Sequence, residues 1–184
     1  GTGLGGGSGD AAALLDCLAS AGYPVERFAA EIGADVPFLL SKAPAALARG
    51  AGEKLSPLRA PSARWRVVVV VPAWRCFTVD MFARLDEYFH DEWESTSERA
   101  CAEARHVFDR LARGEFCGLL PNDFCALLLR EHSEYRALFA DFCRAGAIAW
   151  GISGSGSSAF ALWNKDDFCG FSATLPWVED VLVF

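Results

Sequence analysis

The sequence of 184 residues lacks several features that mark common functional classes. It contains no Gly-Lys dipeptide, which excludes a Walker P-loop, and no run of Lys or Arg that would follow a nucleic-acid backbone. Its formal net charge is −7, from 17 basic and 24 acidic residues. The longest apolar run, Val67 to Val71, is far too short to span a bilayer. We therefore expect neither nucleic acid nor a membrane as a partner.

Metal-ligand and disulfide patterns are missing as well. None of the seven cysteines forms a CxxC pair, and no His lies at ligand spacing with another His or Cys. The odd number of cysteines, several within apolar helical patterns, predicts reduced and buried thiols and hence a cytoplasmic protein. The three histidines, His90, His106 and His132, fall on polar helical segments, where we expect them to be solvated.

The chain does contain ample apolar material, 52% of its residues, enough for one sizeable core or two small ones. In residues 1–63 a glycine-rich loop through Gly9 leads into a helix, followed by a helix at about 26–32 and by two strands within 45–58. The Ala/Pro/Ser stretch at 59–63 predicts a linker and a domain boundary.

Residues 64–184 predict a second domain of mixed helices and strands. Strands are expected at 65–71, 147–152, 159–163 and 180–184, and helices at 78–90, from a capping box at 95–98 onwards, between 124 and 143, and near Asp166. With the two middle helices taken as insertions, the order is β-α-β-β-α-β, a ferredoxin-like plan. The predicted fold class is α+β.

The glycine-rich segment at residues 1–13 is the first candidate site. Glycines let backbone N–H groups approach an anion closely, and a helix N-terminus favours negative charge, so triphosphate is a natural ligand. The letters Gly1-x-Gly3-x-x-Gly6 also satisfy the dinucleotide fingerprint, which requires a preceding strand. Phosphate binding, a dinucleotide fold and a purely structural turn are the alternatives at this point.

The second candidate is Asp35, within Gly33 to Phe38. Pro37 biases the residues before it away from helical geometry, so we expect Asp35 on a loop. A partly desolvated carboxylate on a rigid turn can accept a proton from a substrate hydroxyl or orient it. The alternative is a helix cap or turn-former.

The third candidate is Gly151 to Ser158, which lies between two predicted strands and is longer than a tight hairpin requires. Its glycines and hydroxyls suit a concavity of successive N–H groups that binds an anion. A flexible hairpin loop is the alternative.

Taken together, these segments resemble the GHMP-superfamily kinases, in the form typical of the diphosphocytidyl-methylerythritol kinase family. Residues 1–13 resemble the second family motif, and Gly33 to Phe38 is similar to the segment that carries the catalytic aspartate. The other three matches are Gly50-x-Gly52-Glu53-x-Leu55, Pro121-Asn122-Asp123-Phe124, and Ser153 to Ser158, which resembles the third motif. Gly9 departs from the pattern, since the family usually has a second serine there.

The resemblance implies the two-domain GHMP kinase fold, with the C-terminal part of an S5-like ATP-binding domain in residues 1–63 and a ferredoxin-like C-terminal domain in residues 64–184. It implies ATP-dependent phosphorylation of the 2-hydroxyl of 4-diphosphocytidyl-2-C-methyl-D-erythritol, in isoprenoid precursor synthesis through the methylerythritol phosphate pathway. The implied cofactors are ATP and Mg²⁺, the implied partner is a small-molecule diphosphocytidyl polyol, and the protein is expected to be a monomer or homodimer.

The resemblance also assigns roles to residues. Asp35 is the implied base or hydroxyl-orienting group, and Ser8 is expected to touch phosphate or magnesium. The implied triphosphate cradle comprises Gly3, Leu4, Gly5, Gly6, Gly7, Ser8, Gly9 and Asp10. The implied substrate-binding lid comprises Gly154, Ser155, Gly156 and Ser157.

The family's catalytic lysine, first motif and cytosine-binding aromatic residues have no counterpart in this sequence, so we expect the chain by itself to be incomplete for catalysis. Another GHMP kinase, acting on homoserine, mevalonate or a sugar, is one alternative, although the Leu-Gly-Gly-Gly form of the loop argues against it. A truncated, non-catalytic kinase remnant is the second alternative, and a NAD-binding oxidoreductase is the third.

Overall fold

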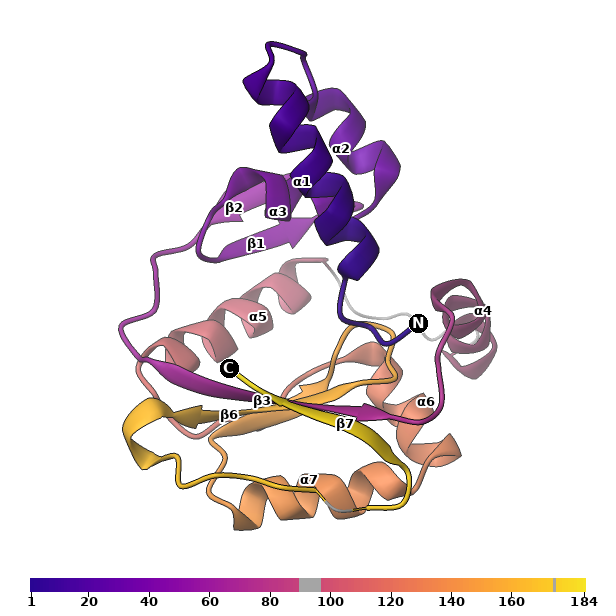
Figure 1. The fold of residues 1–184 in the computed structure, drawn as a ribbon, viewed down its shortest axis with the longest axis vertical. Coiled ribbons are helices and arrows are strands. Elements are labelled where there is room, and N and C mark those ends of the chain that lie inside the picture. Colours follow the sequence, from indigo (N-terminus) through magenta and orange to yellow (C-terminus); the bar gives the residue numbers. More distant parts are fainter. Residues whose placement is uncertain (90–96, 174) are drawn as a thin grey trace. The chain divides into compact units, whose positions relative to one another are not determined.

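The computed structural model describes residues 1–89, 97–173 and 175–184 (Figure 1). Contacts divide the chain into two compact units. The small unit consists of Gly5–Ala60 and Ser97–Arg105, and the large unit consists of Gly1–Leu4 and the described residues of 61–89 and 106–184. The first four residues thus group with the large unit, whereas the helix that they precede belongs to the small unit. The assignment of the domains of the kinase fold to residues 1–63 and 64–184 stays a prediction.

The small unit combines three helices with a hairpin. In chain order these are α1 (Gly6–Ser20), α2 (Glu26–Ile32), α3 (Val36–Ser41), β1 (Ala46–Arg49) and β2 (Lys54–Pro57). The two strands pair antiparallel, and the helices share a core of Ala12, Leu15, Val25, Ala29 and Val36. The predicted second helix and the predicted hairpin are both confirmed. The glycine-rich loop is shorter than predicted, because the Gly9 N–H already donates to the Gly5 carbonyl (2.8 Å) and α1 begins at Gly6.

The large unit is built on a five-stranded sheet. Its spatial order is β4 (Gly118–Leu119), β5 (Ala149–Ile152), β6 (Ala159–Asn164), β3 (Trp65–Pro72) and β7 (Val178–Val183). β4 pairs in parallel with β5, and the other neighbouring strands are antiparallel. The order β5-β6-β3-β7 is that of a ferredoxin-like sheet, and the α+β class is confirmed. The short edge strand β4 was not predicted.

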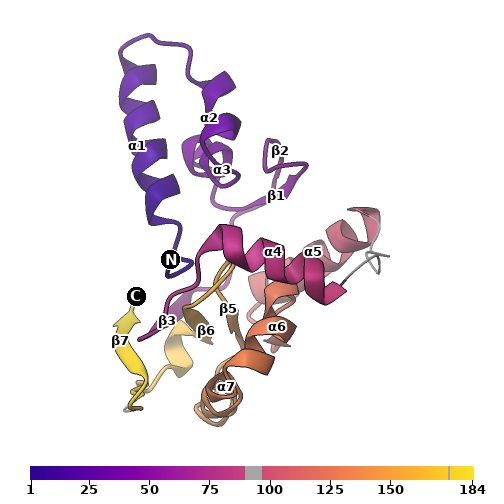
Figure 2. The ribbon, with the colours of Figure 1, turned by 90° about the vertical axis from the view of Figure 1, so that its right-hand side faces the viewer.

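Both faces of this sheet are covered. On one face Val68 and Val70, both fully buried, pack in a core with residues of α6 (Asp123–Glu131) and α7 (Glu134–Arg144). Figure 2 shows these two helices beside the sheet. On the other face Ile148 and Leu162 pack with Leu111 near the end of α5 (Ser97–Ala112). Burying each such valine contributes about 1.5–3 kcal/mol. β3 contains a continuous apolar run because residues on both of its faces are buried or half-buried.

In its described residues, the connection from β6 to β7 contains one 3-10 turn, η1 (Lys165–Asp167), where the sequence predicts a short helix near Asp166. Aromatic side chains of this connection cover the core beside α7. Phe171 lies 5.0 Å from Phe142 between ring centroids, and Phe168 lies 5.3 Å from Trp163. The described part of this connection thus packs on the core without forming an α-helix.

Several expectations about single residues are corrected. All seven cysteines are free, as predicted. The prediction that they are buried is confirmed only for Cys76 and Cys125, and the other five are exposed or half-buried. His106 is exposed as predicted, whereas His132 is half-buried. His90, Ser95 and Thr96 lie outside the described residues. Across the described ranges, the helices are all too short or too polar to cross a membrane.

Candidate active site

The N-terminal turn of α1, in the small unit, is the first part of the site. Gly5 precedes the helix in a left-handed conformation (φ 66°, ψ 20°), which glycine adopts without strain. Within the described part of the chain, no side chain caps this turn, and the turn contains no acidic residue. A Cβ added at Gly6, Gly7 or Gly9 would meet no atom within 4 Å. The first N–H groups of the helix are therefore available to an anion.

A triphosphate fits this turn chemically. The partial positive charge of a helix N-terminus favours an anion, and the hydroxyl of Ser8 lies in the same turn. The glycine at position 9 adds open space and removes only a hydroxyl relative to the resembled motif. The described residues contain no group of three or more His, Cys, Asp or Glu that could hold a metal ion.

Asp35 stands directly before α3, as its N-cap residue. Asp35 lies in the short turn between α2 and α3, so the prediction that it is on a loop is confirmed. The expected bias away from helical geometry is wrong, because Asp35 has helical angles (φ −86°, ψ −18°) and Pro37 occupies the first turn of α3, where a missing N–H costs no hydrogen bond. Val36 is fully buried, whereas Asp35 is exposed and not partly desolvated as expected. Among the described residues, no N–H group donates a capping hydrogen bond to the Asp35 side chain. Its carboxylate is therefore available to accept a hydrogen bond from a ligand.

Three segments that are distant in sequence meet beside Asp35. A Cβ added at Gly33 would lie 3.6 Å from Ser8 Oγ, so the first turn of α1 lies next to the turn that carries Asp35. Gly52, with φ 100°, comes so close that a Cβ there would lie 2.0 Å from the Ala34 carbonyl oxygen. Residues 33–34 thus touch both α1 and the β1–β2 turn.

The β5–β6 connection, in the large unit, is a bonded loop formed by residues 153–158. The Ser153 N–H donates to the Ser158 carbonyl (2.9 Å), and the Gly156 N–H donates to the Ser153 carbonyl (3.0 Å). Three of its side chains are buried: Ser155, Ser157 and Ser158. This loop is ordered by its own bonds, which argues against the flexible-hairpin alternative.

Asn122 anchors the first half of this loop. Its Nδ2 group donates to the carbonyls of Ile152 (3.1 Å) and Gly154 (2.9 Å), while its Oδ1 accepts the Phe124 N–H (2.8 Å). The same side chain therefore caps α6 and fixes the start of the loop. Sequence reasoning did not place Asn122 in the site.

A ring of hydrogen bonds anchors the second half. The Trp74 Nε1–H donates to the Tyr135 hydroxyl (3.2 Å), which donates to the Ser157 carbonyl (2.5 Å). The Ser157 hydroxyl donates in turn to the Trp74 carbonyl (2.9 Å). His132 stacks on Trp74 with ring centroids 4.3 Å apart and planes 5° apart, so it is not the solvated residue that the sequence predicts.

The first residues of the chain pack against the same loop. The Ser158 N–H donates to the Thr2 carbonyl (2.9 Å), and the Ser153 hydroxyl donates to the Gly3 carbonyl (2.7 Å). Gly3 has φ 74°, and a Cβ there would lie 2.2 Å from the Ser153 carbonyl oxygen. The beginning of the second-motif segment and the third-motif loop thus contact each other within the large unit.

Replacing Gly3 by Ala should therefore loosen this contact. Its Cβ must displace backbone atoms of residue 153, in addition to the strain of positive φ, which costs about 1–3 kcal/mol. We expect faster hydrogen exchange at the Ser158 amide, which donates to Thr2. Gly5→Ala is the matched control, because Gly5 also has positive φ but a Cβ there meets nothing within 4 Å. Equal exchange in both variants would contradict the assigned contact.

Some polar groups of the loop have no partner among the described residues. These are the Ser158 hydroxyl, although its residue is fully buried, and the N–H groups of Gly154, Ser155 and Ser157. Unpaired buried polar groups are uncommon in folded proteins, and successive free N–H groups suit an anion. Ser158 belongs to the third candidate segment, but it is not one of the four residues assigned to substrate binding.

Burial shifts the proton affinities of three side chains around this loop. It raises the pKa of the Tyr135 hydroxyl and of the Cys76 and Cys125 thiols, in each case chiefly because the charged form would lose its hydration. Tyr135 therefore stays protonated and able to donate at neutral pH. The two thiols stay uncharged, so neither is an activated nucleophile.

These shifts predict a loss of stability in alkaline solution. A group whose pKa is raised by folding contributes its full stabilisation below its unfolded pKa and loses it as the pH rises toward its folded pKa. The unfolded pKa values are the ordinary ones, near 9 for Cys and 10 for Tyr. Above that pH, each group should lower the free energy of unfolding by about 1.4 kcal/mol per pH unit. Urea unfolding between pH 7.5 and 11 measures this slope. Tyr135→Phe should make the slope shallower above pH 10, and an unchanged slope would contradict the assignment.

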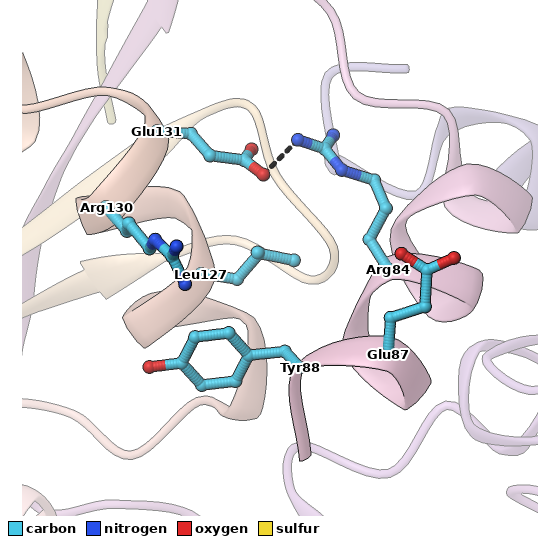
Figure 3. A pocket seen from close by; sticks show the side chains of 6 residues that line it. All are labelled: Arg84, Glu87, Tyr88, Leu127, Arg130 and Glu131. Atoms are coloured by element: carbon cyan, nitrogen blue, oxygen red, sulfur yellow. Dashed lines mark ion pairs between the residues drawn. The ribbon is translucent and has the colours of Figure 1, made fainter. Parts of the chain in front are cut away.

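A separate pocket of about 330 Å³ opens between α4 (Thr78–Phe89) and α6 (Figure 3). It is lined by Arg84, Glu87, Tyr88, Leu127, Arg130 and Glu131. Figure 3 shows the guanidinium of Arg84 directed at the carboxylate of Glu131, with which it forms an ion pair. Because two arginines share the pocket with two glutamates, it carries no excess positive charge to bind phosphates.

Comparison with known proteins shows several relatives that share one name with each other. The chain is 36% identical over 173 residues to the 4-diphosphocytidyl-2-C-methyl-D-erythritol kinase of Nitratidesulfovibrio vulgaris (strain DP4), covering 90% of this chain and 58% of the relative. It is 32% identical over 172 residues to the enzyme of that name in Chlorobium phaeovibrioides, covering 90% and 57%. No protein-family model matches the chain.

A solved structure agrees with these relatives. The crystal structure of a 4-(cytidine 5'-diphospho)-2C-methyl-D-erythritol kinase superposes with a TM-score of 0.65 at 31% identity, over 88% of this chain and 57% of that one. The chain is a homologue of these kinases. It spans a little under three fifths of the length of the relatives that it matches. The resemblance to the diphosphocytidyl-methylerythritol kinase family and the kinase fold are thus confirmed.

The structure distributes the predicted site residues of this kinase homologue between the two units. Gly5 to Asp10 and Asp35 belong to the small unit, whereas Gly3, Leu4 and Gly154 to Ser157 belong to the large unit. The anchors that sequence reasoning missed are Asn122, Trp74 and Tyr135. Asn122 could have been predicted, since its segment resembles a family motif. Tyr135 could not, because it lies in an amphipathic helix, where its position is typical of an ordinary core residue.

Proposed function

We propose that the protein transfers the γ-phosphoryl group of ATP to the 2-hydroxyl of 4-diphosphocytidyl-2-C-methyl-D-erythritol, a step of isoprenoid precursor synthesis through the methylerythritol phosphate pathway. The observation that carries the proposal is the similarity to kinases of this name along 90% of the chain. The uncapped glycine turn of α1 supports it, because an open helix N-terminus suits a triphosphate.

The roles of the small-unit residues follow from their chemistry. The N–H groups at the start of α1 bind phosphate oxygens, and Ser8 adds a hydroxyl ligand for phosphate or magnesium. Gly3 to Asp10 remain the proposed cradle. Magnesium, when bound with the nucleotide, supplies charge neutralisation on the phosphates.

Asp35 takes the role of base or orienting group. It accepts the proton of the 2-hydroxyl while the new oxygen–phosphorus bond forms and the bond between the γ-phosphorus and the departing ADP oxygen breaks. Its lack of a capping bond supports the orienting role, since the carboxylate oxygens are open to a substrate hydroxyl.

Gly154 to Ser157 are the proposed substrate-binding residues of the large unit. For these residues to move as a lid, the hydrogen bonds to Asn122, Trp74 and Tyr135 would have to break. We therefore assign Gly154 to Ser157 as a fixed wall of the substrate site and not as a moving lid. A cytoplasmic location, and a monomer or homodimer, complete the proposal.

An acceptor panel tests the proposed function. The full-length product of the gene is incubated with MgATP and, separately, with diphosphocytidyl-methylerythritol, homoserine, mevalonate and galactose, and ADP release is measured. We expect kcat/KM for the first acceptor to exceed the others by at least about a hundredfold. Preference for another acceptor would support a different GHMP kinase. ATP binding without turnover on any acceptor would support a non-catalytic remnant.

A further inference from the structure

Among the contacts that hold the loop of residues 153–158, two come from side chains of the consecutive helices α6 and α7. Asn122 is the N-cap residue of α6, and Tyr135 lies in the first turn of α7. Neither side chain is an obvious ligand for phosphate, since the Asn122 amide and the Tyr135 hydroxyl are already bonded to carbonyl groups of the loop region.

We infer that Asn122 and Tyr135 are positioning residues, which hold the 153–158 loop in the shape that the phosphoryl acceptor meets. This inference rests on the proposed function. Asn122 joins the carbonyls of residues 152 and 154, and so sets the direction in which the chain leaves β5. Tyr135 holds the carbonyl of Ser157, whose N–H belongs to the unpartnered set.

The Tyr135 anchor is built for fixed geometry. Tyr135 and Ser157 are both fully buried, and the ring of three bonds through Trp74 leaves neither hydroxyl free to rotate toward another partner. Burial also keeps the phenol protonated, as required of a donor. Deleting the Tyr135 hydroxyl would leave the Ser157 carbonyl unpaired in a buried place, which favours a shift of that peptide.

Two conservative variants isolate the anchoring function. Tyr135→Phe removes only the hydroxyl and keeps the ring in the core. Asn122→Ser retains a residue that caps helices well, but its side chain is too short to reach the two loop carbonyls. Asn164→Ser is the matched control, because Asn164 also donates to a backbone carbonyl, that of Gly114, away from the loop. Tyr23→Phe is the control at an exposed tyrosine.

The variants are compared in the full-length gene product by acceptor kinetics, ATP affinity and amide hydrogen exchange. We expect kcat/KM for the diphosphocytidyl acceptor to fall about fivefold to tenfold in each anchor variant, with ATP affinity within about twofold of wild type. The amides of Gly156 and Ser158, both bonded in this structure, should exchange faster. The two control variants should behave as wild type.

Two results would overturn the inference. Unchanged exchange at Gly156 and Ser158 would mean that the side chains do not hold the loop. Faster exchange with unchanged acceptor kinetics would mean that the held shape is irrelevant to the acceptor. If the wild-type protein turned over no acceptor, the proposed function would fail. Exchange at these amides would then still decide whether the two side chains fix the loop, with unchanged protection overturning the inference and faster exchange supporting the anchoring.

Discussion

Asp35→Asn should lower the turnover of the full-length gene product by about 10²–10⁴, the usual loss when a general base is removed. The substitution keeps the size of the side chain and removes only its basicity. Because Asp35 is exposed and its neighbour Val36 provides the buried contact, we expect the free energy of unfolding to change by less than about 0.5 kcal/mol. ATP affinity should change little, since the proposed phosphate ligands lie on α1.

The measurement is single-turnover phosphoryl transfer together with calorimetric titration of ATP. Glu31→Gln is the matched control, because Glu31 is an exposed carboxylate of the same unit at the end of α2. The control should retain full turnover. If Asp35→Asn also kept near-normal turnover, Asp35 would be removed from the mechanism.

Gly6→Val should weaken ATP binding by about tenfold or more, without unfolding the small unit. The reason is the space that the new side chain would fill. Gly6 is the first residue of α1, a Cβ there meets no protein atom within 4 Å, and the positive φ angles lie instead at Gly3 and Gly5. The isopropyl group would therefore occupy the place from which a phosphate approaches the helix N-terminus.

Calorimetry measures the affinity, and circular dichroism checks that the fold is kept. Ala13→Val is the matched control, because it adds the same β-branched side chain to an exposed position of α1, beyond its first turn. This control should bind ATP as wild type does. Unchanged affinity in a folded Gly6→Val protein would exclude the first turn of α1 as the cradle.

Local patterns in the sequence predict much of the fold. The helix at Glu26–Ile32 ends where Gly33 follows it, and the β1–β2 hairpin turns at Gly50 to Gly52, so both were predictable from glycine and periodicity. β3 was predictable from its run of valines. The start of α1 was not, because a stretch of glycines has no hydrophobic periodicity to mark where a helix begins.

The site was less predictable, because its geometry depends on contacts between distant residues. The segment pattern identified Asp35, but its exposure is decided by how Val36 packs among α1 and α2. The hydrogen-bonded ring of Trp74, Tyr135 and Ser157 joins positions separated by 61 and 22 residues. No local pattern encodes such a ring. The stacking of His132 on Trp74 also joins residues distant in the sequence, so it was not predictable either.

The most direct test of the account follows the phosphoryl group itself. The full-length gene product is given ATP labelled in its γ-phosphoryl group together with 4-diphosphocytidyl-2-C-methyl-D-erythritol, and the products are separated and analysed by NMR. The account predicts that the label appears as a new phosphate on the 2-hydroxyl of the acceptor. Label found only in unreacted ATP and inorganic phosphate, with the acceptor unchanged, would contradict it.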